Sequence, residues 1–169
     1  CMEIPDTQFA GSGDLHIAYQ RFGTGPDVVV IPPLVSNVEL SWEQEIFRRV
    51  LEYGARYVRV LQFDKRGIGL SDRTATPDLE KRMEDVRAVL DTAGSERAVL
   101  LGEGPDGGGL NAMYAATFPE RVYGLILWHF HARAAWAPDY PWGLKGRESG
   151  RYATEDVSTY WGREDAIRQ

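Results

Sequence analysis

The chain has 169 residues, 43% of them hydrophobic, which is enough for one domain with a real core. Its formal net charge of −6 argues against nucleic acid as the main partner. No apolar run approaches about 18 residues and no signal-peptide pattern is visible, so we expect no membrane partner and a cytoplasmic location. The single cysteine, Cys1, excludes a disulfide framework and a cysteine-based zinc site.

The N-terminal half is expected to alternate strands and helices. Residues 7–10 and 15–22 are predicted strands around a tight turn, and residues 28–31 form the apolar run typical of a central parallel strand. A helix is indicated by the helical spacing of Trp42, Ile46, Phe47, Val50 and Leu51. A strand over 57–63 follows, then a helix carrying Leu79, Met83, Val86 and Leu90 that stops at Ala93-Gly94.

The stretch 97–128 organises the rest of the chain. A short apolar run over 98–101 predicts a buried strand, and residues 102–109 are too rich in glycine for a strand or a helix interior. Residues 110–118 have helical spacing, Pro119 stops that helix, and 122–128 is a second apolar strand. This βαβ unit predicts an α/β fold, a doubly wound, mostly parallel sheet with helices on both faces.

Three hypotheses compete for the glycine-rich turn. Gly102-x-Gly104-x-x-Gly107 formally matches a dinucleotide fingerprint, but the next strand closes on Trp128-His129 instead of the acidic residue that would hold a ribose. The turn also suits a nucleophile elbow, in which small residues flank a strained position. A glycine-rich turn without chemistry is the third hypothesis, since no Ser or Cys lies between Gly102 and Tyr114.

Several segments resemble the N-terminal part of an α/β-hydrolase-fold protein, of the bacterial kind also found fused to adenylate cyclase or regulator domains. The resemblance rests on Ile17-Ala18-Tyr19-Gln20, on the run Asp64-Lys65-Arg66-Gly67-x-Gly69-x-Ser71-Asp72, on residues 115–122 (Ala-Ala-Thr-Phe-Pro-Glu-Arg-Val) and on residues 137–143. It covers residues 2–142 in the expected order. It implies a shortened α/β-hydrolase-like domain that acts on a small ester or lactone without a cofactor or metal.

The expected elbow departs from the family pattern Gly-x-Ser-x-Gly-Gly. Counting forward from Leu101 places the serine position on Gly104, whereas counting back from Pro119 places it on Pro105, as if one residue had been inserted. In a shifted frame Asp106 becomes the candidate nucleophile, as in the aspartate elbow of haloalkane dehalogenases and epoxide hydrolases. Alternatively, Asp106 caps the following helix.

The remaining candidate site residues come from the ends of neighbouring strands. His131 and His129 are candidate bases for a water, a weaker candidate metal pair, or structural histidines at a strand end. The backbone N–H of Leu34 and that of the residue after the elbow position, Pro105 or Asp106, would hold an oxyanion, although a proline has none. Asp64 and Ser71 belong to the retained loop that the resemblance singles out.

We expect no counterpart of the late segment in which the resembling family carries its catalytic histidine. We expect a hydrolase-like core over 1–131 and a lid-like or edge-covering aromatic tail over 132–169, which holds Trp136, Trp142 and Trp161. Val157, Tyr160, Trp161 and Ile167 suggest an amphipathic helix in that tail. An exposed sheet edge would favour a homodimer.

Two functions follow as hypotheses. The first is a hydrolase of a small ester or lactone with a serine-less site around Asp106 and His131. The second is a catalytically dead hydrolase remnant that binds a small ligand or another protein.

Overall fold

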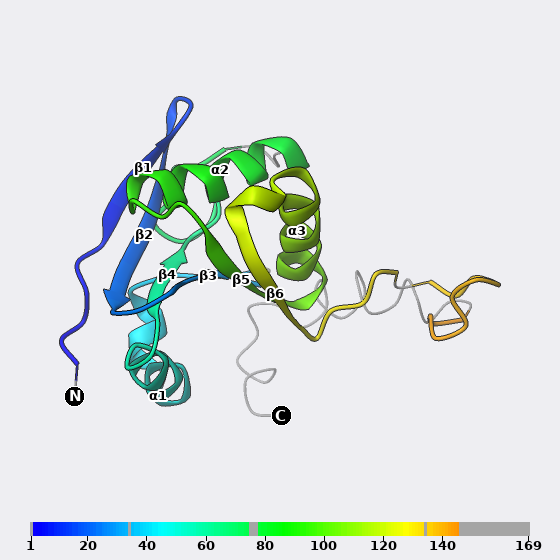
Figure 1. The fold of residues 1–169 in the computed structure, drawn as a ribbon, viewed down its shortest axis with the longest axis horizontal. Coiled ribbons are helices and arrows are strands. Elements are labelled where there is room, and N and C mark those ends of the chain that lie inside the picture. Colours follow the sequence, from blue (N-terminus) through cyan, green and yellow to red (C-terminus); the bar gives the residue numbers. More distant parts are fainter. Residues whose placement is uncertain (1, 34, 75–77, 134, 146–169) are drawn as a thin grey trace, which may run out of the picture. The chain divides into compact units, whose positions relative to one another are not determined.

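The computed structural model describes residues 2–33, 35–74, 78–133 and 135–145. The chain divides into two compact units, Cys1–Phe130 and His131–Gln169. The first unit is built on a six-stranded sheet in the order β1-β2-β4-β3-β5-β6 (Figure 1). The strands are β1 (Gln8–Ser12), β2 (Leu15–Gly23), β3 (Asp27–Ile31), β4 (Arg59–Phe63), β5 (Ala98–Glu103) and β6 (Val122–Trp128).

The sheet is mostly parallel. Strands β4, β3, β5 and β6 pair in parallel, whereas β2 pairs antiparallel with both β1 and β4. The helical elements are η1 (Leu40–Glu43), α1 (Glu45–Gly54), α2 (Leu79–Thr92), α3 (Gly104–Thr117) and η2 (Pro119–Arg121). Since the parallel strands are joined through helices, their carboxyl ends meet at one edge of the sheet, where α/β proteins form their sites.

The core lies on both faces of the sheet, because alternate residues of each strand point to opposite sides. Leu61 and Phe63 of β4 belong to the larger cluster, which includes residues of α2 and α3, while Val60 joins a smaller cluster with Trp42 and Phe22 beside α1. Figure 1 accordingly shows α1 on one side of the sheet and α2 and α3 on the other. The predicted fold class is confirmed.

Local sequence signals explain the ends of α2 and of β6. The Asp78 side chain accepts a hydrogen bond of 2.9 Å from the Lys81 N–H and so caps α2. Gly94, just beyond α2, has φ +67°, the left-handed conformation that ends helices. The β6 boundaries agree with the predicted strand over 122–128.

Several predicted strand bounds differ by one or two residues, as for the strand expected over 57–63, which begins at Arg59, and two predictions about helices are wrong. The helix expected through Trp42 and Leu51 is two elements, η1 and α1, because Gln44 between them has extended backbone angles. Helix α3 begins at Gly104. Most of the glycine-rich stretch that was expected to be a turn therefore forms the N-terminal part of this helix. Tight packing accounts for this: a Cβ at Gly107 would lie 2.9 Å from the Ile31 carbonyl oxygen, so the glycines permit close approach of helix and sheet.

The second unit is described over 131–133 and 135–145. Its chain turns so that the Trp136 N–H donates to the Leu144 carbonyl at 2.9 Å, and the rings of Tyr140 and Trp142 lie 5.4 Å apart. The amphipathic helix predicted around Tyr160 and Trp161 falls outside the described residues. Within the described part of the chain, no helix has the length and apolar character needed to cross a membrane.

Candidate functional site

The turn between β5 and α3 has its strained position at Gly104. Its φ of +68° lies in the left-handed region, which L side chains rarely adopt, and an added Cβ there would meet no atom within 4 Å. A sharp strand-to-helix turn of this kind is where an α/β hydrolase exposes its nucleophile. The strained position therefore falls on the first of the two predicted candidates, and it carries no side chain.

The residue after Gly104 offers no backbone donor. Pro105 lies in the first turn of α3, is exposed and has no N–H. An oxyanion near Gly104 thus lacks the donor that would normally follow the nucleophile. The other predicted donor, Leu34, lies outside the described residues.

Asp106 lies two residues beyond the strained position, in the first turn of α3. The N-cap residue of this helix is Glu103, so the proposed capping role of Asp106 is wrong, although its charge still suits the N-terminal end of the helix dipole. The Asp106 carboxylate forms a hydrogen-bonded ion pair with the Lys65 ammonium. Its other oxygen lies 2.7 Å from Nη2 of Arg82 on α2.

The Lys65–Asp106 pair ties together the ends of three parallel strands. Lys65 follows β4, Asp106 follows β5, and the Lys65 ammonium also donates to the carbonyl oxygen of Pro33, which follows β3. The Lys65 side chain is 6% exposed and that of Asp106 is 31% exposed. A mostly buried ion pair therefore joins these strand ends at the carboxyl edge of the sheet.

Burial and the two neighbouring cations shift the pKa of Asp106 in opposite directions. Burial alone would raise the pKa of the Asp106 carboxyl, but the hydrogen bond and charge of Lys65, with the charge of Arg82, hold that pKa below its ordinary value. Burial also lowers the pKa of Lys65, more than its bond to Asp106 raises it. Asp106 is therefore ionised at neutral pH, and it is a weak base.

Sequence reasoning missed Lys65 and Arg82 as partners of Asp106. Lys65 lies inside the run Asp64–Asp72 that the family resemblance had singled out, which was the available signal. Arg82 gave none, because it lies within the predicted helix as one charged residue among several. Lys65 and Asp106 are 41 residues apart in the chain, and only the sheet order brings them together.

Asp64 and Ser71 hold the loop that follows β4. The buried Asp64 carboxylate accepts hydrogen bonds from the Ser36 hydroxyl at 2.7 Å and from the Leu70 N–H at 3.0 Å. The Ser71 hydroxyl donates to the Asp64 carbonyl at 2.6 Å and accepts from the Ala18 N–H at 2.9 Å. Because these polar groups form hydrogen bonds to the loop and its neighbours, both residues hold the loop in its conformation.

His129 lies directly after β6 with an unusual backbone. Its φ is +54°, and its exposed ring lies 5.0 Å from the ring of Trp128. The next residue, Phe130, packs against Gly108 of α3 so closely that a Cβ at Gly108 would lie 2.5 Å from its ring. The end of β6 is thereby fixed against α3, the helix that carries Asp106.

His131 belongs to the second compact unit, His131–Gln169, whereas Asp106 belongs to the first. The predicted partnership of Asp106 with His131 therefore stays a prediction.

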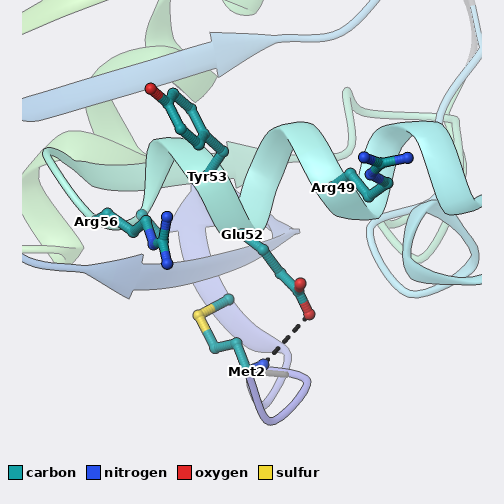
Figure 2. Close-up of a pocket in the computed structure, with 6 residues that line it drawn as sticks. Met2, Arg49, Glu52, Tyr53 and Arg56 are labelled. Atoms are coloured by element: carbon teal, nitrogen blue, oxygen red, sulfur yellow. Dashed lines mark hydrogen bonds between the residues drawn. The ribbon is translucent and has the colours of Figure 1, made fainter.

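A cavity of about 480 Å³ lies away from these residues, on α1. Figure 2 shows Glu52 accepting a hydrogen bond from the backbone N–H of Met2, with Arg49 and Arg56 on either side of Glu52 along the chain. The N–H to carboxylate distance is 3.2 Å. The cavity is lined by Met2, Arg49, Glu52, Tyr53, Ala55 and Arg56. It shares no residue with the turn at Gly104.

A curated relative of this chain is a hydrolase. The chain is 31% identical over 121 residues to a 2-hydroxy-6-oxononadienedioate/2-hydroxy-6-oxononatrienedioate hydrolase of Paraburkholderia phymatum, a match that covers 69% of this chain and 41% of the relative. No protein-family profile matches the chain. The chain thus spans less than half the length of this curated relative.

Solved structures agree with that relationship. Est816, described as an N-acyl homoserine lactone degrading enzyme, is 29% identical with a TM-score of 0.61, over 71% of this chain and 44% of Est816. A bromoperoxidase from Bacillus anthracis, 23% identical, shares the fold with a TM-score of 0.70 over 91% of this chain and 55% of its own. The chain belongs to the α/β-hydrolase-fold family. The Paraburkholderia relative is named a hydrolase, and Est816 is described as a lactone degrading enzyme.

Proposed function

We propose that this protein uses the α/β-hydrolase fold to bind a small ester or lactone and does not form an acyl-enzyme. The observation that carries the proposal is the glycine at the strained position of the β5–α3 turn. Without a side chain, Gly104 cannot attack a carbonyl carbon, and Pro105 cannot donate an N–H to the resulting oxyanion. In this interpretation the turn is a nucleophile elbow that has lost its nucleophile.

Family membership favours this interpretation over the dinucleotide fingerprint. The position of Asp106 supports the proposal further. An aspartate nucleophile would be expected at the strained position, whereas Asp106 lies two residues beyond Gly104. Its carboxylate is also shared between Lys65 and Arg82, which lowers both its basicity and its nucleophilicity. The arrangement is better suited to joining the carboxyl ends of the parallel strands than to nucleophilic attack.

The ligand class comes from the relatives. Est816 is described as degrading N-acyl homoserine lactones, and it is among the more similar solved structures. A neutral lactone or short ester is accordingly the first ligand to test.

The test measures binding and turnover on the same preparation. The purified chain, verified by intact mass, is titrated with an N-acyl homoserine lactone by calorimetry and assayed for hydrolysis of that lactone and of short-chain aryl esters. We expect a saturable binding signal, no turnover above buffer, and no acyl adduct in the mass spectrum. Absence of any binding, or an acyl adduct on the protein, would contradict the proposal.

A second candidate function is slow hydrolysis by direct attack of water. The supporting observation is that the Asp106 carboxylate is ionised and 31% exposed at the carboxyl edge of the sheet. Asp106, or a histidine such as His129 or His131, would take a proton from the water as its oxygen attacks the ester carbonyl. No covalent intermediate is needed in such a reaction.

Variants separate the two candidates. We expect the Asp106→Ala, His129→Ala and His131→Ala proteins to show the same background rate as the unmodified protein. The control is Asp91→Ala, which removes a carboxylate that pairs with Arg121 at 2.7 Å. Turnover that follows the protein peak and disappears in the Asp106 or a histidine variant, but not in the control, would establish the second candidate.

A further inference from the structure

Lys65 is a buried cation that lies between two loops of the candidate site. Its side chain is 6% exposed. Its ammonium donates to the Pro33 carbonyl, in the loop after β3, and to the Asp106 carboxylate, just beyond the β5–α3 turn. In active α/β hydrolases, backbone N–H groups of these same two loops bind the carbonyl oxygen of the substrate. Lys65 therefore lies beside the place where this fold binds an oxygen atom of its ligand.

The Lys65 ammonium has more donors than its described partners use. An ammonium carries three N–H donors, and Pro33 and Asp106 accept two of them. The carboxylate of the neighbouring Asp64 is hydrogen-bonded to other groups. One N–H of the ammonium is therefore left without an acceptor in the described part of the chain.

Positive charge exceeds negative charge where Lys65 and Asp106 meet. Nη2 of Arg82 lies 2.7 Å from the second Asp106 oxygen, so two cations share one carboxylate. Burial lowers the pKa of Lys65 more than its bond to Asp106 raises it. One shared carboxylate therefore does not replace the hydration that the buried ammonium has lost, and a second anion beside it would be stabilised.

We propose that Lys65 binds a carboxylate of the ligand, so that this site holds the open-chain acid formed by hydrolysis of an ester or lactone more tightly than the neutral ester or lactone. The inference rests on the function proposed above and names the chemical form of its ligand. A carboxylate offers the ammonium both a hydrogen bond and an opposite charge, whereas an ester carbonyl offers only the hydrogen bond. Since Asp106 is 31% exposed, the ion pair is within reach of such a ligand.

Calorimetry on the unmodified protein at neutral pH compares three ligands that carry the same acyl chain. They are an N-acyl homoserine, which is the open-chain acid, its neutral open-chain carboxamide, and the neutral N-acyl homoserine lactone. We expect the acid to bind at least about tenfold more tightly than either neutral ligand. Binding of none of the three would contradict the proposed function, whereas equal affinity for the acid and the carboxamide would overturn this inference alone.

Variants test whether Lys65 is the group that produces this preference. Lys65→Met replaces the ammonium by an apolar side chain of similar length, so the acid should then bind no more tightly than the carboxamide. Lys81→Met is the matched control, because it removes the same charge from an exposed position on the neighbouring helix α2 and should leave the preference intact. A purely structural role for Lys65 would lower both affinities by the same factor, and that result would overturn the proposal. An equal loss of the preference in the two variants would also overturn it.

Arg82→Met provides a second test that does not depend on the folding of Lys65→Met. It removes the other cation and retains both partners of the Lys65–Asp106 pair, so the carboxylate then belongs to Lys65 alone. The preference for the acid should fall several-fold, because less positive charge remains uncompensated. A preference that stays unchanged in Arg82→Met would contradict the proposed excess of charge.

Discussion

At the scale of single residues, the loop after β4 is fixed by a buried ion pair. The Arg66 guanidinium makes two hydrogen bonds to Asp85 of α2, at 2.7 and 2.6 Å, and a third to the Lys81 carbonyl at 2.9 Å. The side chains of Arg66 and Asp85 are 6% and 2% exposed. Removing one partner from such a pair leaves a buried charge uncompensated, which is costlier than the pair itself is stabilising.

We therefore predict that Asp85→Ala lowers the free energy of unfolding by about 3–5 kcal/mol. The control is Asp91→Ala, because Asp91 pairs with Arg121 but its side chain is 56% exposed. That exposed pair should contribute no more than about 1 kcal/mol. Urea denaturation at neutral pH measures both, and equal losses in the two variants would contradict the importance of burial.

Asp106 gives a pH-dependent prediction. Lys65 and Arg82 hold its pKa below the ordinary value in the folded protein, so the ionised carboxyl stabilises the fold at pH values above its unfolded pKa. This stabilisation is lost as the pH falls through the lower, folded pKa. The unfolding free energy of Asp106→Asn should therefore lie below that of the unmodified protein at pH 7, and the difference should shrink on acidification.

Urea denaturation of both proteins from pH 7 downward measures that difference. A gap that stays constant between neutral and strongly acidic pH would show that Asp106 acts through its shape and not through its charge.

At the scale of elements, β5 and α3 approach so closely that glycine is required. A Cβ at Gly102 would lie 2.6 Å from the Gly107 carbonyl oxygen and 2.4 Å from Nδ2 of Asn111, whose buried amide has no hydrogen-bond partner. The carbonyl belongs to the backbone of the helix and cannot move without shifting α3. This contact fixes the distance between strand and helix, and with it the position of Gly104.

We expect Gly102→Ala to destabilise the protein by about 1–3 kcal/mol, as other overpacked sites do. Gly124→Ala is the matched control, since Gly124 lies in the neighbouring strand β6 and its added Cβ would meet no atom within 4 Å. That variant should be neutral or slightly stabilising. Thermal unfolding followed by circular dichroism compares the two, and a Gly102→Ala protein as stable as the control would contradict the proposed contact.

At the scale of the whole molecule, the spacing of apolar residues and the positions of glycine and proline predicted the fold better than the site. The strand over 122–128 and the helix end at Gly94 follow from local signals, because apolar runs and left-handed glycines act through their nearest neighbours. The start of α3 was missed because tertiary packing overrode the local preference of glycine. The Lys65–Asp106 pair was missed because strand order alone brings those residues together.

The structure was also needed to identify the residue at the strained position of the turn. Counting along the sequence left Gly104 and Pro105 equally eligible, and a backbone angle distinguished them. A proline could never have occupied that position, because its ring fixes φ near −65°.

The open space around Gly104 bears on how this chain relates to its active relatives over evolutionary time. An added Cβ there meets no atom of the described residues within 4 Å, so the described side chains leave room for the first carbon of a side chain. A serine at this position would carry backbone strain of about 1–2 kcal/mol, a cost that the turn geometry of the fold already imposes on active hydrolases. If the turn is a nucleophile elbow that has lost its side chain, as we propose, the described residues have not repacked into the position of the missing Cβ.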